Sequence, residues 1–188
     1  MNHDIVAQLR EATGEAHARL EARLDMVRRV SSPVERRALV ERFYGLHAGA
    51  EECLGPLLEP VEDLSFPERR RAPIILEDLA ALGRDHEESP AVCVLPAPES
   101  RAEALGFFYV LEGSTLGGKV IRRELAACGQ VATGLAFLDP YGHRSGEKWR
   151  TFLAVLRREC PSGEVALADQ AVFGAVSAFR HAESWLVP

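Results

Sequence analysis

Apolar residues return at steps of three and four along almost the whole of this chain, and this is the period of an α-helix. The pattern is already present at the start, where the spaced apolar positions are Ile5, Leu9, Ala12, Ala16 and Leu20. Strand signals are weak, and the one short β-like run is Val92 to Leu95. A chain with this period must bury helical stripes against one another, so the sequence predicts an all-α fold.

Start and stop signals divide the pattern into separate expected helices. Ser32 is a candidate N-cap with Pro33 at the first helical position, and Ser100 to Glu103 reads as a capping box. Gly55-Pro56 and Gly83 are expected stops. The expected helices are residues 5–27, 33–54, 67–82, 100–127, 146–159 and 164–186, in a single multi-helix bundle domain over residues 1–188.

Composition and charge exclude several classes of function. With 188 residues, 47% of them apolar, the chain can build one domain with its own core. The net charge of −6 gives no global field that favours nucleic acid or an anionic membrane. The four cysteines include no Cys-x-x-Cys pair, which argues against structural zinc. Because we see neither a signal peptide nor a membrane-spanning run, we expect a cytoplasmic protein that binds neither nucleic acid nor membrane.

The common catalytic signatures are missing from the sequence. It has no Gly-x-Ser-x-Gly, no Gly-x-Gly-x-x-Gly and no phosphate-binding loop. The Glu-x-x-His pairs of di-iron bundles and the His-Glu-x-x-His signature are absent too. The remaining kinds of function for such an all-α chain are binding a cofactor, binding a partner helix and scaffolding.

The segment around His17 is the first with unusual chemistry. His17 falls at the edge of the apolar stripe, beside Thr13 and Leu20. Glu21, one turn later, can accept a hydrogen bond from the second imidazole nitrogen, which is how metal-bound histidines are oriented. Arg10 lies on nearly the same face, about 10.5 Å earlier along the axis, where it can hold an anion. Two interpretations stay open, because a histidine at such an edge is more often a hydrogen-bonded boundary residue than a ligand.

Three glycines stand close together in the longest expected helix, at Gly113, Gly117 and Gly118. Each interior glycine costs a helix about 1 kcal/mol relative to alanine, so the cluster needs a reason. Gly113 and Gly117 share one face with Gly118 beside them, which makes a flat, bare surface suited to a planar ring. Close helix packing, a kink or a break between two helices are the alternatives.

Two further groups follow towards the C-terminus. We expect a solvated helix face for the residues Lys148, Trp149, Arg150 and Arg157. For Arg150 the alternative is that it holds a carboxylate. We expect core positions for the aromatic residues Phe173, Phe179 and Trp185.

Together these segments resemble the heme oxygenase family over nearly the whole chain. The segment around His17 looks like that family's proximal helix. The resemblance implies that His17 is the iron ligand, with Glu21 behind it and Arg10 at a heme propionate. Gly113 to Gly118 looks like the glycine-rich distal helix that bends over the heme. The helix with Arg150 is similar to one that supplies another propionate contact.

The resemblance implies that heme (iron protoporphyrin IX) is both substrate and cofactor, sandwiched between a proximal and a kinked distal helix. The implied reaction opens heme to biliverdin, carbon monoxide and ferrous iron, using O2 and external electrons. The implied heme contacts are Arg10, Thr13, His17, Leu20, Glu21, Gly113, Gly117, Gly118, Lys148, Arg150 and Phe173. The implied catalytic positions are Gly113, Ser114, Gly117 and Gly118, and the implied metal ligand is His17.

The stretch Tyr109 to Gly118 looks most like bacterial members associated with bacteriophytochromes. This implies a bacteriophytochrome as recipient of biliverdin. A separate reductase or ferredoxin is expected as electron donor, because the sequence has no flavin or nicotinamide motif. Ser114 stands where animal members have an aspartate that organises the water delivering protons. Some bacterial members lack that aspartate as well, and we expect turnover without it.

Two alternatives to the enzyme remain at this stage. A non-catalytic heme carrier or sensor on the same fold would keep its heme intact when a reductant is added. A heme-free helical enzyme of the same architecture, related to thiaminase II, would give no Soret band.

Overall fold

The computed structural model describes residues 4–84 and 90–187. Within these residues the chain forms helices and no strand, which confirms the all-α fold. The α-helices are α1 (Ile5–Leu24), α2 (Met26–Ser31), α3 (Pro33–Leu58), α4 (Ala72–Ala81), α5 (Arg101–Ala127), α6 (Ser145–Glu159) and α7 (Val165–Leu186). Short 3₁₀ helices are η1 (Phe66–Arg69), η2 (Ala136–Leu138) and η3 (Gly142–Arg144).

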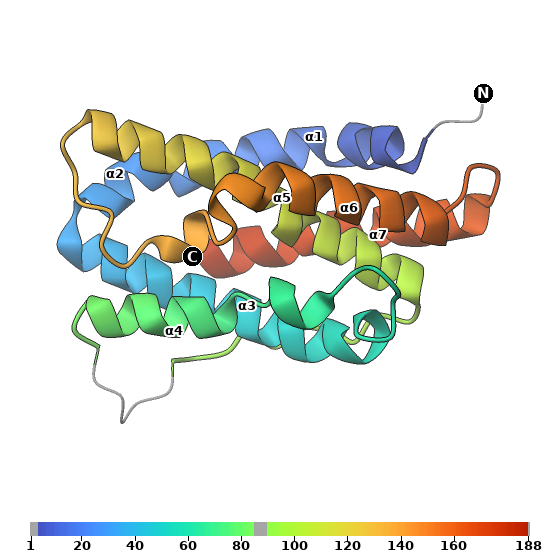
Figure 1. The fold of residues 1–188 in the computed structure, drawn as a ribbon, viewed down its shortest axis with the longest axis horizontal. Helices are drawn as coiled ribbons and strands as arrows, with labels where there is room; N and C mark the ends of the chain where they lie inside the picture. Colours follow the sequence, from blue (N-terminus) through green and yellow to red (C-terminus); the bar gives the residue numbers. More distant parts are fainter. Residues whose placement is uncertain (1–3, 85–89, 188) are drawn as a thin grey trace.

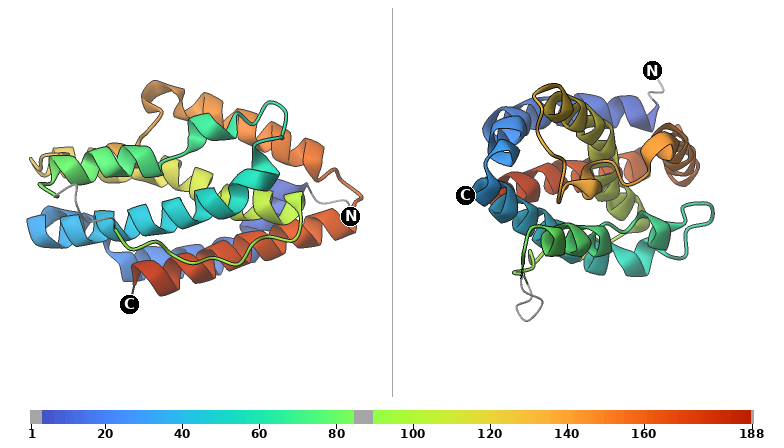
Figure 2. Two further views of the ribbon diagram at one scale, coloured as in Figure 1. Left: turned by 90° about the horizontal axis from the view of Figure 1, so that it is seen from below. Right: turned by 60° about the vertical axis from the view of Figure 1, so that its left-hand side comes forward.

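Helices α5 and α7 cross in the middle of the molecule, with α1 and α6 on one side of them and α3 and α4 on the other (Figures 1 and 2). The crossing is close because glycine stands on both helices. A Cβ atom on Gly106 would lie 1.8 Å from the carbonyl oxygen of Ala171, and one on Gly174 would lie 2.0 Å from that of Glu103. These two positions therefore exclude any side chain, and they fix how α5 lies on α7.

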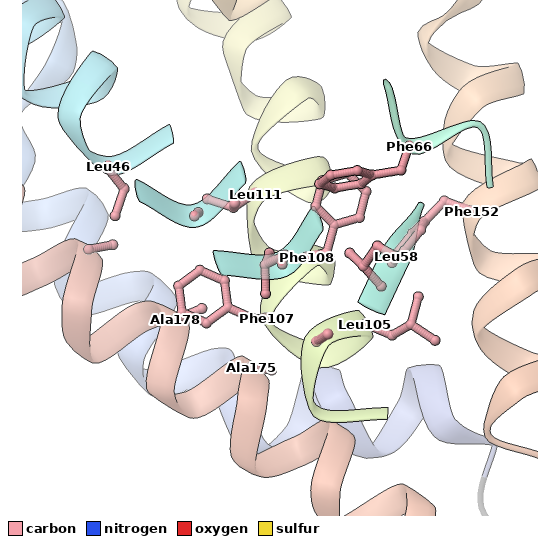
Figure 3. Close-up of a cluster of buried hydrophobic side chains, with 14 of the residues drawn as sticks. Leu46, Leu58, Phe66, Leu105, Phe107, Phe108, Leu111, Phe152, Ala175 and Ala178 are labelled. Atoms are coloured by element: carbon pink, nitrogen blue, oxygen red, sulfur yellow. The ribbon is translucent and has the colours of Figure 1, made fainter. Parts of the chain in front are cut away.

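Aromatic rings join the elements around α5 into one core (Figure 3). Phe108 on α5 packs edge-on against Phe66 of η1, with ring centroids 5.2 Å apart, and against Phe152 of α6 at 5.6 Å. Phe66 and Phe152 are fully buried. Such pairs stabilise a core beyond their buried area, so η1 and α6 are held firmly to α5.

Two predicted helix starts are confirmed by their caps. The Ser32 hydroxyl accepts a hydrogen bond from the Glu35 amide at 3.4 Å, with Pro33 in the first turn of α3. The Ser100 hydroxyl accepts one from the Glu103 amide at 3.2 Å at the start of α5. Each cap satisfies an amide that has no partner inside its own helix.

Two predicted helix ends are wrong. The expected helix 5–27 is divided into α1 and α2 by Asp25, whose backbone is left-handed with φ 41°. The expected stop at Gly55-Pro56 does not end α3, which continues to Leu58. Proline removes only one backbone hydrogen bond this close to a helix end, and the continuation buries Leu58 completely.

The expected single helix 67–82 is also wrong. Arg70 is extended, with φ −65° and ψ 133°, between η1 and α4. The Glu51 carboxylate on α3 accepts hydrogen bonds from the amides of Arg71 and Ala72, at 2.5 and 3.0 Å. A helix start capped from another helix has no local signal, so periodicity could not locate it.

The run from Val92 to Leu95 is not a strand. Its Cys93 amide donates to the carbonyl of Gly45 on α3 at 3.0 Å, so this segment lies along α3. Among the described residues no helix combines the length and apolar character needed to cross a bilayer. The cytoplasmic location expected from the sequence stays a prediction.

Candidate functional site

Two contacts mark the ends of the region between α1 and α5. At one end, Arg10 on α1 hydrogen-bonds the hydroxyl of Tyr109 on α5. Burial raises the pKa of that hydroxyl, and the Arg10 charge opposes the rise. At the other end, α2 packs on α5. Between these contacts α5 presents one stripe of half-buried and exposed positions, Gly113, Leu116, Gly117 and Val120. We call this region the α1–α5 opening, and its α5 side is apolar and bare at the two glycines.

His17 lies seven residues after Arg10, on nearly the same face of α1. The two helices run in the same direction along the molecule (Figure 1). Seven residues advance a helix by about 10.5 Å. Counted from the Arg10–Tyr109 contact, His17 on α1 therefore stands opposite Leu116 and Gly117 on α5.

The His17 ring is held at one nitrogen only. Its Nδ1 lies 3.4 Å from Oε2 of Glu21, and its ring meets the edge of Phe179 on α7 with centroids 5.8 Å apart. Its side chain is 57% exposed, and no described residue hydrogen-bonds to its Nε2. Thr13 and Leu20 take part in the packing of α1, because the Thr13 hydroxyl donates to the Leu9 carbonyl at 2.7 Å and Leu20 lies against the core.

The three glycines of α5 have three different surroundings. A Cβ atom on Gly117 would meet nothing within 4 Å, whereas one on Gly113 would touch the ring of Trp149 on α6 at 3.4 Å. On Gly118 it would lie 1.9 Å from the carbonyl oxygen of Leu138. The expectation of one bare surface is therefore wrong for Gly118, which makes room for η2. Because α5 is continuous through all three positions, a break between two helices is excluded.

Comparison with known proteins decides the family. The family description Heme oxygenase matches residues 3–187. The chain belongs to the heme oxygenase family. A protein of Xanthomonas campestris pv. campestris (strain 8004) named Heme oxygenase is 37% identical over 147 residues, which cover 76% of this chain and 83% of that protein. Members of the heme oxygenase family degrade heme, which serves as both substrate and cofactor, and this chain is such an enzyme.

At Ser114 this heme oxygenase has a hydroxyl with two partners. It donates to the Leu111 carbonyl at 2.7 Å and accepts from Nη1 of Arg71 at 2.9 Å. The second guanidinium nitrogen of Arg71 donates to the same carbonyl. Sequence analysis missed Arg71, because we expected it inside a helix and gave it no role.

A set of buried and half-buried polar residues around Glu112 was missed as well. We call Glu112, Arg69, Arg71 and Tyr141 the Glu112 cluster. The sequence carried one signal for it, since Glu112 follows Leu105 and Phe108 at helical spacing and so falls in the buried stripe of α5. Further inside, burial and the Arg71 charge hold the pKa of His47 well below its usual range, so this histidine is neutral.

The remaining expected heme contacts have different surroundings. The expected solvated face is wrong for Lys148, whose side chain is only 12% exposed and pairs with Glu68 at 2.8 Å. Arg150 is exposed at the surface of α6. The expected core position is wrong for Phe173, which is 59% exposed on α7, whereas Phe179 on the same helix is buried.

Two more residues singled out in the sequence have structural partners. The Trp185 indole is half-buried and donates to the Arg42 carbonyl at 2.7 Å. Arg157 pairs with Asp4 at 2.9 Å.

Proposed function

We propose that heme binds in the α1–α5 opening with its iron on Nε2 of His17. The observation that carries this proposal is the His17 ring, which has one nitrogen beside Glu21, the other without a described partner, and a bare apolar stripe opposite. A flat apolar ring with an iron atom matches this set of features. The reaction is the oxidative opening of heme to biliverdin, carbon monoxide and ferrous iron.

Residues of this chain have separate tasks in the proposal. Heme supplies the oxygen-activating iron and is itself the molecule cleaved. Glu21 accepts a hydrogen bond from Nδ1–H of His17, which leaves the lone pair of Nε2 for the metal. Gly117 leaves room on the opposite face of the ring. Arg10 and Arg150 pair with the propionates and set the in-plane rotation of the heme.

Proton delivery in this proposal does not need a carboxylate side chain at position 114, which is Ser114. The Ser114 hydroxyl lies between Arg71 and the Leu111 carbonyl, a polar group able to order water at the edge of the opening. Bridging water is nearly as good as a direct hydrogen bond. A general acid typically raises a reaction rate by about 10²–10⁴-fold. The absence of an aspartate should therefore lower the turnover rate without abolishing it.

Electrons come from a separate protein in this proposal, because the sequence has no flavin or nicotinamide motif. A reductase or a ferredoxin fits that role. A bacteriophytochrome as recipient of biliverdin rests on the resemblance of Tyr109 to Gly118 to bacterial members associated with such receptors.

Heme titration followed by ascorbate in air tests the function. We expect a Soret band that decays while the broad red absorption of biliverdin grows. His17→Ala should change the ferric spectrum and lower turnover by more than about 10²-fold, beyond the loss typical of an outer-shell partner of a metal. His143→Ala, at an exposed histidine on η3, is the matched control.

The outcomes separate the alternatives. An unchanged Soret and visible spectrum in His17→Ala would contradict the ligand assignment. Stable heme in the wild-type chain after ascorbate would favour the carrier or sensor. A wild-type chain without any Soret band would contradict heme binding altogether.

A further inference from the structure

The carboxylate of Glu112 is buried directly beside the proposed heme face. Its side chain is 1% exposed, and it precedes Gly113 on α5. One oxygen accepts a hydrogen bond from Nη1 of Arg69. The other accepts one from the Tyr141 hydroxyl at 2.9 Å and lies 3.8 Å from Nη2 of Arg71. Every donor therefore comes from outside α5.

These donors connect α5 to three other elements. Arg69 ends η1, and Tyr141 immediately precedes η3. Arg69 also donates to the Leu64 carbonyl at 2.6 Å and to the Lys148 carbonyl of α6 at 3.2 Å. The residue after Lys148 is Trp149, whose ring lies against Gly113. A single carboxylate thus joins η1, η3 and α6 to the turn of α5 where the bare stripe begins.

A buried charged group of this kind is not the most stable way to fill the space. Replacing a buried ion pair by apolar residues of similar volume is often neutral or stabilising, because the desolvation of the charges is costly. The hydrogen bonds instead fix the orientation of α5, because they depend on angle as well as distance. Apolar contacts tolerate a small rotation of α5 about its axis, whereas donors from several segments on one carboxylate do not. Such a rotation would turn the stripe of Gly113 and Gly117 away from the opening.

We propose that Glu112 is a positioning residue for heme cleavage. It fixes the rotation of α5, so that the bare stripe faces the ring and the ring sits in one orientation. This inference rests on the proposed function, because the rotation of α5 matters only when heme lies against the stripe.

The test compares Glu112→Gln and Tyr141→Phe with Arg36→Gln. Glu112→Gln removes the charge and keeps an acceptor, and Tyr141→Phe removes one donor and keeps every charge. Arg36 is the control: it is 8% exposed and donates to the carbonyls of Val30 and Val131, at 2.5 and 2.9 Å, on α2 and beyond the end of α5. We expect Arg36→Gln to lower the unfolding temperature without moving the other readouts.

Two readouts distinguish positioning from simple stability. In heme-free protein, hydrogen exchange of the 109–121 peptide should be faster in Glu112→Gln than in the wild-type chain. Tyr141→Phe should show a smaller increase. In heme-loaded protein, the biliverdin isomers separated by chromatography should shift from the wild-type ratio to a broader mixture. We expect turnover of Glu112→Gln to fall about 10-fold, as for the loss of an outer-shell partner of a metal.

Unchanged exchange and isomer ratio in Glu112→Gln would overturn the proposal. If that variant does not fold, the same two unchanged readouts in Tyr141→Phe would overturn it. A wild-type chain that binds no heme would contradict the proposed function and this inference together, whereas normal wild-type turnover with unaffected variants contradicts only the role of Glu112.

Discussion

The two sides of the α1–α5 opening are attached to the molecule in different ways. α5 is tied by buried charges, since Glu112 and Arg69 are each 1% exposed. α1 is tied to α7 at the surface, where Arg19 and Arg23 pair with Glu183 at 3.0 and 2.8 Å and both arginines are 50% exposed. The charged contacts that fasten α5 are thus buried, and those that fasten α1 are in contact with water.

This difference predicts unequal rigidity. Breaking a buried pair leaves an uncompensated charge and costs about 3–5 kcal/mol. Surface pairs contribute little, because water and salt compete for both partners. We therefore expect α5 to act as the fixed side of the opening and α1 as the side that shifts when heme enters.

The largest effect on stability should come from Gly118→Leu, which disrupts the packing of α5 against η2. The new side chain would meet the Leu138 carbonyl, which lies 1.9 Å from the position of a Cβ atom. We expect the free energy of unfolding to fall by about 3 kcal/mol, the upper end of ordinary overpacking. Urea unfolding measures it. A loss below about 1 kcal/mol would show that η2 yields easily, and α5 would then not be the fixed side.

At Gly117, one residue earlier, we expect a smaller change in stability, and of opposite sign. Gly117→Ala meets no atom within 4 Å and removes a poor helix former, so heme-free protein should gain up to about 1 kcal/mol. Heme affinity, measured by Soret titration, should fall because the methyl group stands where the ring would lie. Gly118→Ala is the matched control and should lose stability. Unchanged heme affinity in Gly117→Ala would remove Gly117 from the heme face.

The smallest effect concerns the attachment of α1. Hydrogen bonds from Arg19 and then Arg23 hold the pKa of Glu183 below its ordinary value of 4.5. A lowered carboxyl pKa gives stabilisation that is present above the ordinary value and is lost as the pH falls through the folded one. Relative to the intrinsic exchange rate at each pH, hydrogen exchange of α1 in heme-free protein should therefore be faster below about pH 4, while that of α5 is not.

Glu183→Gln should reproduce this faster exchange of α1 at neutral pH and show no further acid step from this group. High salt should act in the same direction, because it screens surface pairs. Equal exchange of α1 and α5 under all these conditions would contradict the contrast between the two sides.

Local signals in the sequence predicted the helices that begin with their own caps and end near glycine or proline. Ser32 and Ser100 located the starts of α3 and α5 within one residue. The break at Arg70 could not be predicted, because the group that starts α4 is Glu51, far away in the sequence. Propensity and period describe a segment by itself, and here a tertiary contact decided the outcome.

The same limit applies to the candidate site. His17 and Glu21 are one turn apart on a single helix, so their pairing follows from spacing alone. Gly117 and Gly118 are adjacent and of one type, yet only the position of η2 separates an open glycine from a buried one. The Glu112 cluster draws on segments about 30 and 40 residues away, and only its position in the apolar stripe of α5 was visible beforehand.

The packing of α7 has a consequence for the order of events during synthesis. Both sides of the opening lie on this helix: α1 through Phe179 and Glu183, and α5 through Gly174. A ribosome makes residues 165–186 after it has made α1 and α5, at about 5–20 residues per second. Until that stretch emerges, α1 lacks the helix on which it packs, and α5 lacks one of its supports. We therefore expect a nascent chain to capture no heme until α7 has left the exit tunnel.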